Sequence, residues 1–339
     1  MRKNYARSLT TAGILLLVLS LILPTIPYLW ISATAGATSA AESGQSHPGV
    51  NFWHSVRRGE AGYSVTSGSE TAVFINSNGQ SWRQYRTEIL VPYASYLMAT
   101  VLVLIALFFL LRGPIQIKDG ASGRLLLRFS INQRVIHWFT AILFWLLALT
   151  GLILLYGRLV LIPLLGARGF AITASACKEA HNLFGPLFLA ALVMLFIAFV
   201  RDNFYAKGDL MWLLKGGGMF TKHASAGRFN FGEKTWFWLA CLLGLAVSIS
   251  GLVLDFPSLG QNRSTIELAH VLHTAGAIIF IAISFGHIYL GTIGTQGTLR
   301  GMATGYVDAN WAEHHHDRWS PDSGNPVVSE NQQTDAERL

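Results

Sequence analysis

Four histidines stand within or at the ends of long apolar stretches, and imidazole is a common metal ligand. His137 and His181 each open such a stretch, in RVIHWF and KEAHNLFG, whereas His273 and His287 share the last one, in AHVLHTAGA and FGHIYLG. Ionisable side chains inside a membrane helix are costly and usually functional. These residues are therefore the first candidates for the chemistry of the chain.

The spacing of the last two histidines predicts that they lie on one face of one helix. His273 and His287 are 14 residues apart, which is within about 40° of four helical turns and spans about 21 Å. The charges of the connections predict that 135 to 157 and 235 to 254 run outward, whereas 180 to 200 and 268 to 299 run inward. His273 then lies at the depth of His181, and His287 at the depth of His137. Two imidazoles at each depth match the two axial positions of a six-coordinate haem iron and leave none for a tetrahedral zinc.

One histidine in a membrane helix more often bonds a carbonyl or lies at an interface, so the haem prediction depends on four residues that agree in depth and face. His270 is the competing outer ligand, because it lies one turn before His273. It is 17 residues from His287, hence about 100° away around the helix, which favours His273. The other histidines belong to an external extension or are expected on solvated surface, without a ligand role: His47, His54, His223, His314, His315 and His316.

Glycines accompany the candidate ligands, at Gly151, Gly185, Gly251, Gly276 and Gly286. A flat macrocycle between helices needs neighbours without bulky side chains. Close helix packing favours small residues equally, so the glycines alone do not decide between the two.

The elements that carry these residues are predicted from charge-free stretches of about 20 residues or more, the length that about 30 Å of hydrocarbon demands of a helix. The chain is 52% hydrophobic and 13% charged, whereas soluble domains carry about a quarter charged residues. The stretches run approximately over 8 to 41, 91 to 111, 135 to 157, 180 to 200, 235 to 254 and 268 to 299. We therefore predict an all-α integral membrane protein: a four-helix di-haem core over 135 to 300, a preceding transmembrane helix over 91 to 111, and a signal peptide or first anchor over 1 to 41.

Lys and Arg in the connections predict the orientation, because cytoplasmic loops carry an excess of them. The connections over 112 to 134 and 201 to 234 hold five and six, whereas those over 158 to 179 and 255 to 267 hold three and one. The first two are then cytoplasmic and the last two external. The tail over 301 to 339 is cytoplasmic, and the extension over 42 to 90 is periplasmic.

The charge and the cysteines exclude other classes of function. The net charge of +7 would suit nucleic acid, but the basic residues form short clusters beside apolar runs, which is typical of topology signals. Cys177 and Cys241 are far apart, so they form neither a disulfide framework nor an iron–sulfur or zinc motif. We expect no nucleic-acid partner, and any iron–sulfur cluster must belong to a partner protein.

A quinone site is one interpretation of GRFNFGEKTWFW, just before the fifth apolar stretch. The Asn230 amide and the Gly232 backbone, beside aromatic residues, could hold a quinone carbonyl next to the cytoplasmic haem, while protons arrive from water. An ordinary turn and cap at the start of a helix is an equally good interpretation of the same two residues.

Five motifs occur in the chain in one order: RFSINQRVIHWF, KEAHNLFG, RFNFGEK, LHTAGA with GHIY 14 residues later, and GTLRGMATGYVDANWAEHHHDRW. They resemble the gamma subunit of formate dehydrogenase, its cytochrome b subunit, over about residues 125 to 320. The last motif distinguishes this subunit from the related di-haem cytochromes of hydrogenases and thiosulfate reductases.

The resemblance implies an electron-transfer subunit in the bacterial inner membrane. Family members receive electrons from a periplasmic iron–sulfur beta subunit, after a molybdenum- or tungsten-containing alpha subunit oxidises formate, and pass them to menaquinone or ubiquinone. Carried over to this chain, two haem b groups would have the ligand pairs His181 with His273 (outer) and His137 with His287 (inner), and quinone would lie near Asn230, Gly232, Glu233 and His287. Glu233 stands where some members have glutamine, and a proton relay is a hypothesis for it.

Three alternatives are open at this point. The same di-haem subunit could serve another periplasmic oxidoreductase, such as a hydrogenase or a thiosulfate reductase. A transporter or intramembrane metallohydrolase would use the histidines directly, but the apolar stretches hold no Asp, Glu or HExxH pattern. A haem-free anchor, whose histidines merely pack, would give a colourless preparation.

Overall fold

The structure is a computed structural model that describes residues 82–218, 224–257, 261–319 and 327–329. The predicted segment over 1 to 41, most of the extension over 42 to 90, and the three residues His47, His54 and His223 lie outside the described residues. The account below concerns Leu90–Leu339, which forms one compact unit.

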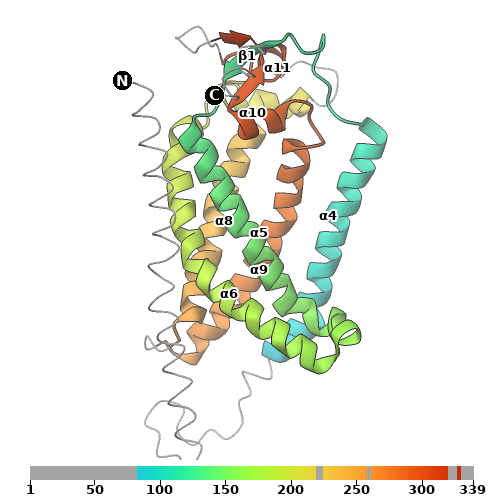
Figure 1. The fold of residues 1–339 in the computed structure, drawn as a ribbon, viewed down its shortest axis with the longest axis vertical. Coiled ribbons are helices and arrows are strands. Elements are labelled where there is room, and N and C mark those ends of the chain that lie inside the picture. Colours follow the sequence, from blue (N-terminus) through green and yellow to red (C-terminus); the bar gives the residue numbers. More distant parts are fainter. Residues whose placement is uncertain (1–81, 219–223, 258–260, 320–326, 330–339) are drawn as a thin grey trace, which may run out of the picture. The chain divides into compact units, whose positions relative to one another are not determined.

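Among the described residues, five helices are long and apolar enough to cross a membrane. In Figure 1, α5, α6, α8 and α9 run along the long axis beside one another, and α4 lies along α9. The chain is therefore a multi-pass, mostly helical membrane protein, as predicted. The five helices are α4 (Val91–Arg112), α5 (Ile131–Val160), α6 (Ile162–Phe199), α8 (Phe231–Asp255) and α9 (Arg263–Gly291).

Polar side chains start three of these helices. Ser130 and Gln133 form a capping box at α5, in which the Ser130 hydroxyl accepts from the Gln133 backbone N–H at 3.3 Å. Asn230 caps α8 in the same way, and the Asn262 side chain accepts from the Thr265 N–H at α9. Such caps satisfy backbone donors that the first turn leaves unpaired, so they define where α5, α8 and α9 begin.

The connection over 158 to 179 is helical rather than an irregular loop, because α6 begins at Ile162 and only Leu161 separates it from α5; its external position stays a prediction. Gly166 interrupts the helical backbone with φ 70° and ψ 171°, and the helix continues beyond it. Charge counting detects where a chain leaves hydrocarbon, whereas a helix can extend into water. Similarly, α9 covers Arg263–Gly291 rather than 268 to 299.

A small sheet closes one end of the helices, which the all-α prediction did not include. β1 (Arg124–Leu127) pairs antiparallel with β2 (Tyr306–Asp308) and β3 (Val327–Ser329), in the order β2-β1-β3. With α10 (Thr298–Thr304) and α11 (Ala309–His315), it forms a cap over the starts of α5 and α8 (Figure 1). Shorter elements are η1 (Tyr85–Leu90), η2 (Val200–Asp202), α7 (Asp209–Leu214) and η3 (Gly216–Gly218).

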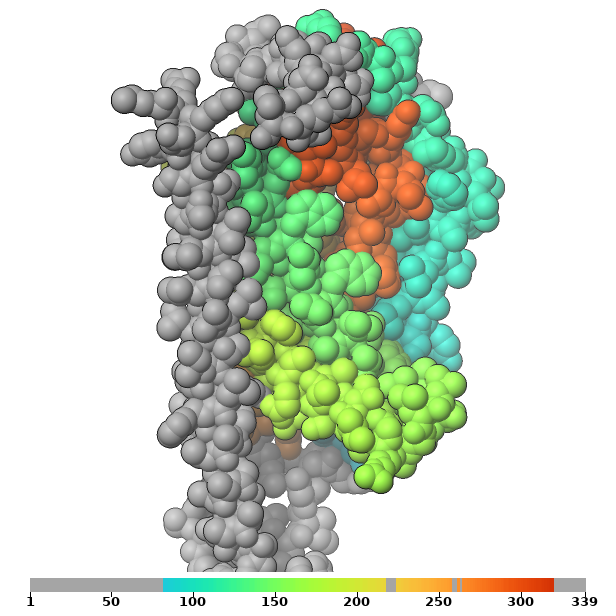
Figure 2. Space-filling view, viewed as in Figure 1, coloured from blue at the N-terminus to red at the C-terminus, as the bar shows by residue number. Residues whose placement is uncertain are grey.

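The cap has its own hydrophobic core and is fastened to the membrane helices. Leu126 and Val307 of the paired strands pack with Trp311 of α11, and all three are buried. Figure 2 shows α5 beside α10 on one face of the molecule, where the Trp138 indole donates to the Met302 carbonyl at 3.1 Å. The predicted cytoplasmic tail is thus a folded element as far as Trp319.

Candidate functional site

The structure brings His181 of α6 to His273 of α9, with ring centroids 5.9 Å apart. His273 Nδ1 lies 2.9 Å from the Val247 carbonyl oxygen, and His181 Nδ1 lies 2.9 Å from the Thr150 hydroxyl oxygen. A carbonyl only accepts, so Nδ1 of His273 donates and Nε2 carries the lone pair. These bonds orient both rings and leave the Nε2 of His273 free for a metal.

The structure also brings His137 of α5 to His287 of α9, with ring centroids 6.3 Å apart. The His287 ring is stacked on Trp236 of α8, at 4.6 Å between centroids and 13° between planes. His137 Nδ1 is buried and has no hydrogen-bond partner among the described residues. This pair lies at the end of the helices that carries the cap, because both histidines stand near the cap-side ends of α5 and α9.

The spacing of each pair agrees with one iron between two rings. Two metal–nitrogen bonds of about 2 Å each, with the distance from each nitrogen to its ring centre, add up to about 6 Å. The observed separations are 5.9 Å and 6.3 Å. The residues therefore fit a haem at each pair, and their ligand role stays a prediction.

His270 lies one turn before His273 on α9, and it is His273 that the structure pairs with His181. No group of three or more His, Cys, Asp or Glu in the described part of the chain could hold a metal ion by itself. The part of the chain that the structure describes therefore gives the intramembrane metallohydrolase alternative no support.

Two glycines make room for the outer histidines. A Cβ on Gly251 would lie 3.0 Å from His273 Cε1, and one on Gly151 would lie 3.2 Å from His181 Cε1. At Gly276 a Cβ would instead meet Val247 at 3.1 Å, which is ordinary close helix packing. Close packing therefore applies at Gly276, whereas the room that the glycines would leave for a macrocycle stays a prediction.

Gly251→Val should displace the His273 ring, because the added carbons need the space that the ring occupies. We expect roughly half of the haem to be lost, since only the outer site is disturbed. Haem content per chain measures this, with Gly291→Ala as the control, because a Cβ there meets nothing within 4 Å. Full haem content in Gly251→Val would contradict the expected role of this glycine.

An aromatic cluster lies between the two histidine pairs. Phe280 stands seven residues from both His273 and His287 on α9, and it packs on Phe144 with ring centroids 4.9 Å apart. Phe188 of α6 lies 6.4 Å from Phe280, and both rings are buried. The two pairs are thus separated by a packed apolar layer that excludes water.

The predicted quinone residues form the cap of α8. The Asn230 side-chain oxygen accepts from the Glu233 N–H at 2.9 Å, and the Glu233 carboxylate accepts from the Asn230 N–H at 2.9 Å. A Cβ on Gly232 would lie 3.3 Å from the Trp212 ring. The cap interpretation of Asn230 and Gly232 therefore holds, while a quinone contact by these residues stays a prediction.

Arg128 is a buried cation beside this cap that sequence reasoning missed. Its Nη2 donates to Glu233 Oε1 at 3.0 Å, and its Cζ lies 4.7 Å from the Trp311 ring centre and 5.6 Å from that of Trp319. Burial lowers the pKa of Arg128 from its ordinary value, and the Glu233 carboxylate opposes that shift. The aromatic rings and the carboxylate together stabilise its charge.

His316 is not on the solvated surface, so that prediction is wrong. Its side chain is 1% exposed, its Nδ1 lies 2.8 Å from the Gly227 carbonyl oxygen, and its Nε2 lies 3.8 Å from Glu233 Oε2. Burial, and then the charge of Arg128, hold the pKa of His316 well below 6.5, and burial lowers the pKa of His315 to about 4. Both rings are therefore neutral at pH 7.

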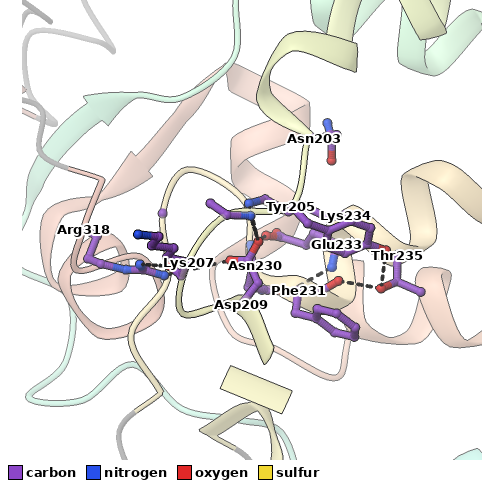
Figure 3. A network of polar contacts seen from close by, with 12 residues as sticks. Asn203, Tyr205, Lys207, Asp209, Asn230, Phe231, Glu233, Lys234, Thr235 and Arg318 are labelled. Atoms are coloured by element: carbon purple, nitrogen blue, oxygen red, sulfur yellow. Dashed lines mark hydrogen bonds and ion pairs between the residues drawn. The ribbon is translucent and has the colours of Figure 1, made fainter. Parts of the chain in front are cut away.

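A second buried ion pair, drawn in Figure 3, joins α8 to α7. Lys234 Nζ lies 2.7 Å from Asp209 Oδ2, and the two side chains are 7% and 4% exposed. The same carboxylate accepts from the Ala206 N–H at 2.7 Å, and Arg318 Nη2 lies 3.9 Å from its other oxygen. The start of α8 thus carries two adjacent charge pairs: Lys234 with Asp209, both buried, and Glu233, 33% exposed, with the buried Arg128.

Comparisons with known proteins agree with the motifs. A family model described as prokaryotic cytochrome b561 matches residues 128–305, a span that holds all four histidines. The formate dehydrogenase cytochrome b556(fdo) subunit of Escherichia coli K12 is 28% identical over 199 residues, covering 57% of this chain and 91% of that subunit. The nitrate-inducible formate dehydrogenase cytochrome b556(Fdn) subunit of the same strain is 28% identical over 205 residues (59% and 92%). The formate dehydrogenase cytochrome b556 subunit of Haemophilus influenzae is 27% identical over 205 residues (57% and 82%). The predicted resemblance to formate dehydrogenase cytochrome b subunits is confirmed.

Proposed function

The chain belongs to the prokaryotic cytochrome b561 family, and from this we propose that it is the gamma subunit of a membrane-bound formate dehydrogenase. In this role it anchors the complex and transfers electrons from an iron–sulfur beta subunit, through two haem b groups, to membrane quinone. The proposal rests on one observation: helix α9 contributes one histidine to each of two histidine pairs, whose ring centroids are 5.9 Å and 6.3 Å apart. Similarity to formate dehydrogenase subunits supports the choice of partner enzyme.

Each haem, when bound, would supply a one-electron carrier within the membrane. His181 with His273 would hold the outer group, and His137 with His287 the inner one. The Val247 carbonyl orients His273 through its Nδ1, and such outer bonds raise the basicity of a ligating imidazole. The chain thus orients His273 for ligation through its own backbone.

We place the cap on the cytoplasmic side of the bacterial inner membrane, because Lys and Arg concentrate in the connections that build it. The core over 135 to 300 then spans the membrane, with the extension over 42 to 90 on the periplasmic side. The outer pair faces the side where the beta subunit, and through it the molybdenum or tungsten alpha subunit, would dock. The inner pair faces the side where protons are taken up.

The quinone would be reduced near the start of α8. Glu233 stands one turn before Trp236, whose ring is stacked on His287. The Glu233 side chain is 33% exposed, so it can exchange protons with water while it remains paired with Arg128 at 3.0 Å. In this proposal Asn230, Gly232 and Glu233 would line the quinone site next to His287, on the cytoplasmic side of the inner pair.

Stopped-flow mixing tests the proposed acceptor. The purified protein, reduced under nitrogen, is mixed with a short-chain quinone, and the reduced haem absorbance is followed. We expect reoxidation that saturates with quinone concentration. Reduced protein that the quinone does not reoxidise would contradict quinone as the acceptor, and copurification with a hydrogenase instead of a formate-oxidising subunit would contradict the choice of complex.

Glu233→Gln tests the proton relay. Glutamine can keep the capping box but cannot carry a proton, so quinone reduction should fall by about ten- to hundredfold and lose part of its pH dependence. The rate of quinone reduction between pH 6 and 8 is the measurement. Glu313→Gln is the control, because Glu313 is exposed on α11. An unchanged rate and pH profile in Glu233→Gln would remove Glu233 from the path.

A further inference from the structure

A cavity of about 650 Å³ opens where α5 begins and α6 ends. Its polar lining includes Arg128, Ser130, Gln133 and Arg228, and its apolar lining includes Met194 and Ile197 of α6. The Gln133 side chain also bridges the two helices, because it donates to the Ala198 carbonyl at 3.2 Å. The volume is in the range of small-molecule sites, about 300–1,000 Å³.

The charge of this lining is positive. Among the described lining residues, Arg128 and Arg228 are charged and none is acidic. Arg228 Nη1 pairs with Asp202 at 2.7 Å, and Arg128 pairs with Glu233, so each guanidinium is anchored from outside the cavity. Each ion pair thereby holds its guanidinium in place and leaves other N–H groups of that guanidinium as possible donors.

Two of those donors are unused. The Arg128 side chain is 3% exposed, and its Nη1 is buried without a hydrogen-bond partner among the described residues. The Nε of Arg228 is likewise a buried donor without a hydrogen-bond partner among the described residues. Leaving buried donors of a cation unpaired costs free energy. Such donors therefore fit an oxyanion, which accepts charge-assisted hydrogen bonds from guanidinium groups.

The other half of the cavity is apolar and exposed. Met194 and Ile197 are 40% and 69% exposed on α6, within a predicted membrane span. The first turn of α5, capped by Ser130, lies at the polar half, and the N-terminus of this 30-residue helix favours negative charge. A ligand with an anionic head group and an apolar tail matches both halves of the cavity: the head group would lie at the polar half, and the tail would lie along α6.

We propose that this cavity binds an anionic phospholipid, with its phosphate at Arg128 and Arg228 and an acyl chain against Met194 and Ile197. Basic pockets between membrane helices bind such headgroups through the same chemistry. A quinone head carries no negative charge to accept charge-assisted hydrogen bonds from the remaining donors of Arg128 and Arg228, and inorganic phosphate leaves the apolar half empty. This site does not depend on the proposed function.

Native mass spectrometry of the full chain, delipidated in detergent, tests the proposal. The protein is titrated separately with phosphatidylglycerol, phosphatidylcholine and inorganic phosphate. We expect one phosphatidylglycerol per chain to bind at least tenfold more tightly than the other two. Arg228→Gln should weaken phosphatidylglycerol about tenfold, whereas the control Arg201→Gln, an exposed arginine outside the described lining, should not.

Ile197→Trp provides a second variant, because Ile197 is exposed and its replacement narrows the apolar half without touching the ion pairs. It should weaken phosphatidylglycerol while the protein stays folded by circular dichroism. Equal binding of the two phospholipids would overturn the proposal, as would inorganic phosphate binding as tightly as phosphatidylglycerol, or displacement of the lipid by a short-chain quinone. Unchanged lipid binding in both Arg228→Gln and Ile197→Trp would overturn it as well.

Discussion

Replacing His287 by alanine should remove the inner haem, leave about one haem per chain, and lower quinone reduction by about a hundredfold or more. His287 supplies one of the two imidazoles of the inner pair, whose ring centroids are 6.3 Å apart. Its ring is also stacked on Trp236, which holds the imidazole in place and which alanine cannot reproduce. Haem content, the reduced-minus-oxidised spectrum and the rate of quinone reduction measure the effect.

The matched variants are on the same helix. His273→Ala should remove the outer haem instead, because His273 pairs with His181 at 5.9 Å. His270→Ala should keep both haems, since His270 lies one turn away from the ligand position. If His270→Ala lost a haem while His273→Ala kept both, the assignment of the outer ligand would be wrong.

Lys234→Met should lower the free energy of unfolding by about 3–5 kcal/mol, the usual cost of leaving one member of a buried ion pair without its partner. Asp209 is 4% exposed and loses the ammonium group at 2.7 Å, keeping the Ala206 N–H and the more distant Arg318. Thermal unfolding in detergent, followed by circular dichroism, measures the change.

Two further variants distinguish the loss of this buried ion pair from the effect of removing any lysine charge. Lys178→Met breaks the exposed pair with Glu179, which is 4.0 Å long with side chains 64% and 50% exposed, and should cost less than about 1 kcal/mol. Lys234→Met with Asp209→Asn should recover much of the lost stability, because the buried charge is then gone. A Lys234→Met effect as small as that of Lys178→Met would show that the pair contributes little.

The membrane helices could be predicted from the sequence because the signals are local. A stretch without charges identifies a span, although α5 and α8 begin at Ile131 and Phe231, four residues before the apolar stretches predicted from 135 and 235. The 14-residue spacing of His273 and His287 determines their common face on α9, since helical geometry is regular over that length. These features need no information about distant parts of the chain.

The cap could not be predicted, because its contacts join distant segments through short elements. Leu126 pairs with Val307 across strands of four and three residues, too short to show an alternating pattern. The polar composition around His316 suggests solvent, yet this segment folds over the start of α8. Arg128 likewise carries no local sign that Glu233 and Trp311 will enclose it.

The central claim is that the chain holds two haems between its two histidine pairs. The most direct test is a reduced-minus-oxidised visible spectrum of the purified membrane protein, with haem and protein quantified on the same sample. We predict the bands of b-type haem with two haems per chain. Folded protein that is colourless, although haem was supplied during expression, would contradict the claim and leave the buried histidines as packing residues of a haem-free anchor.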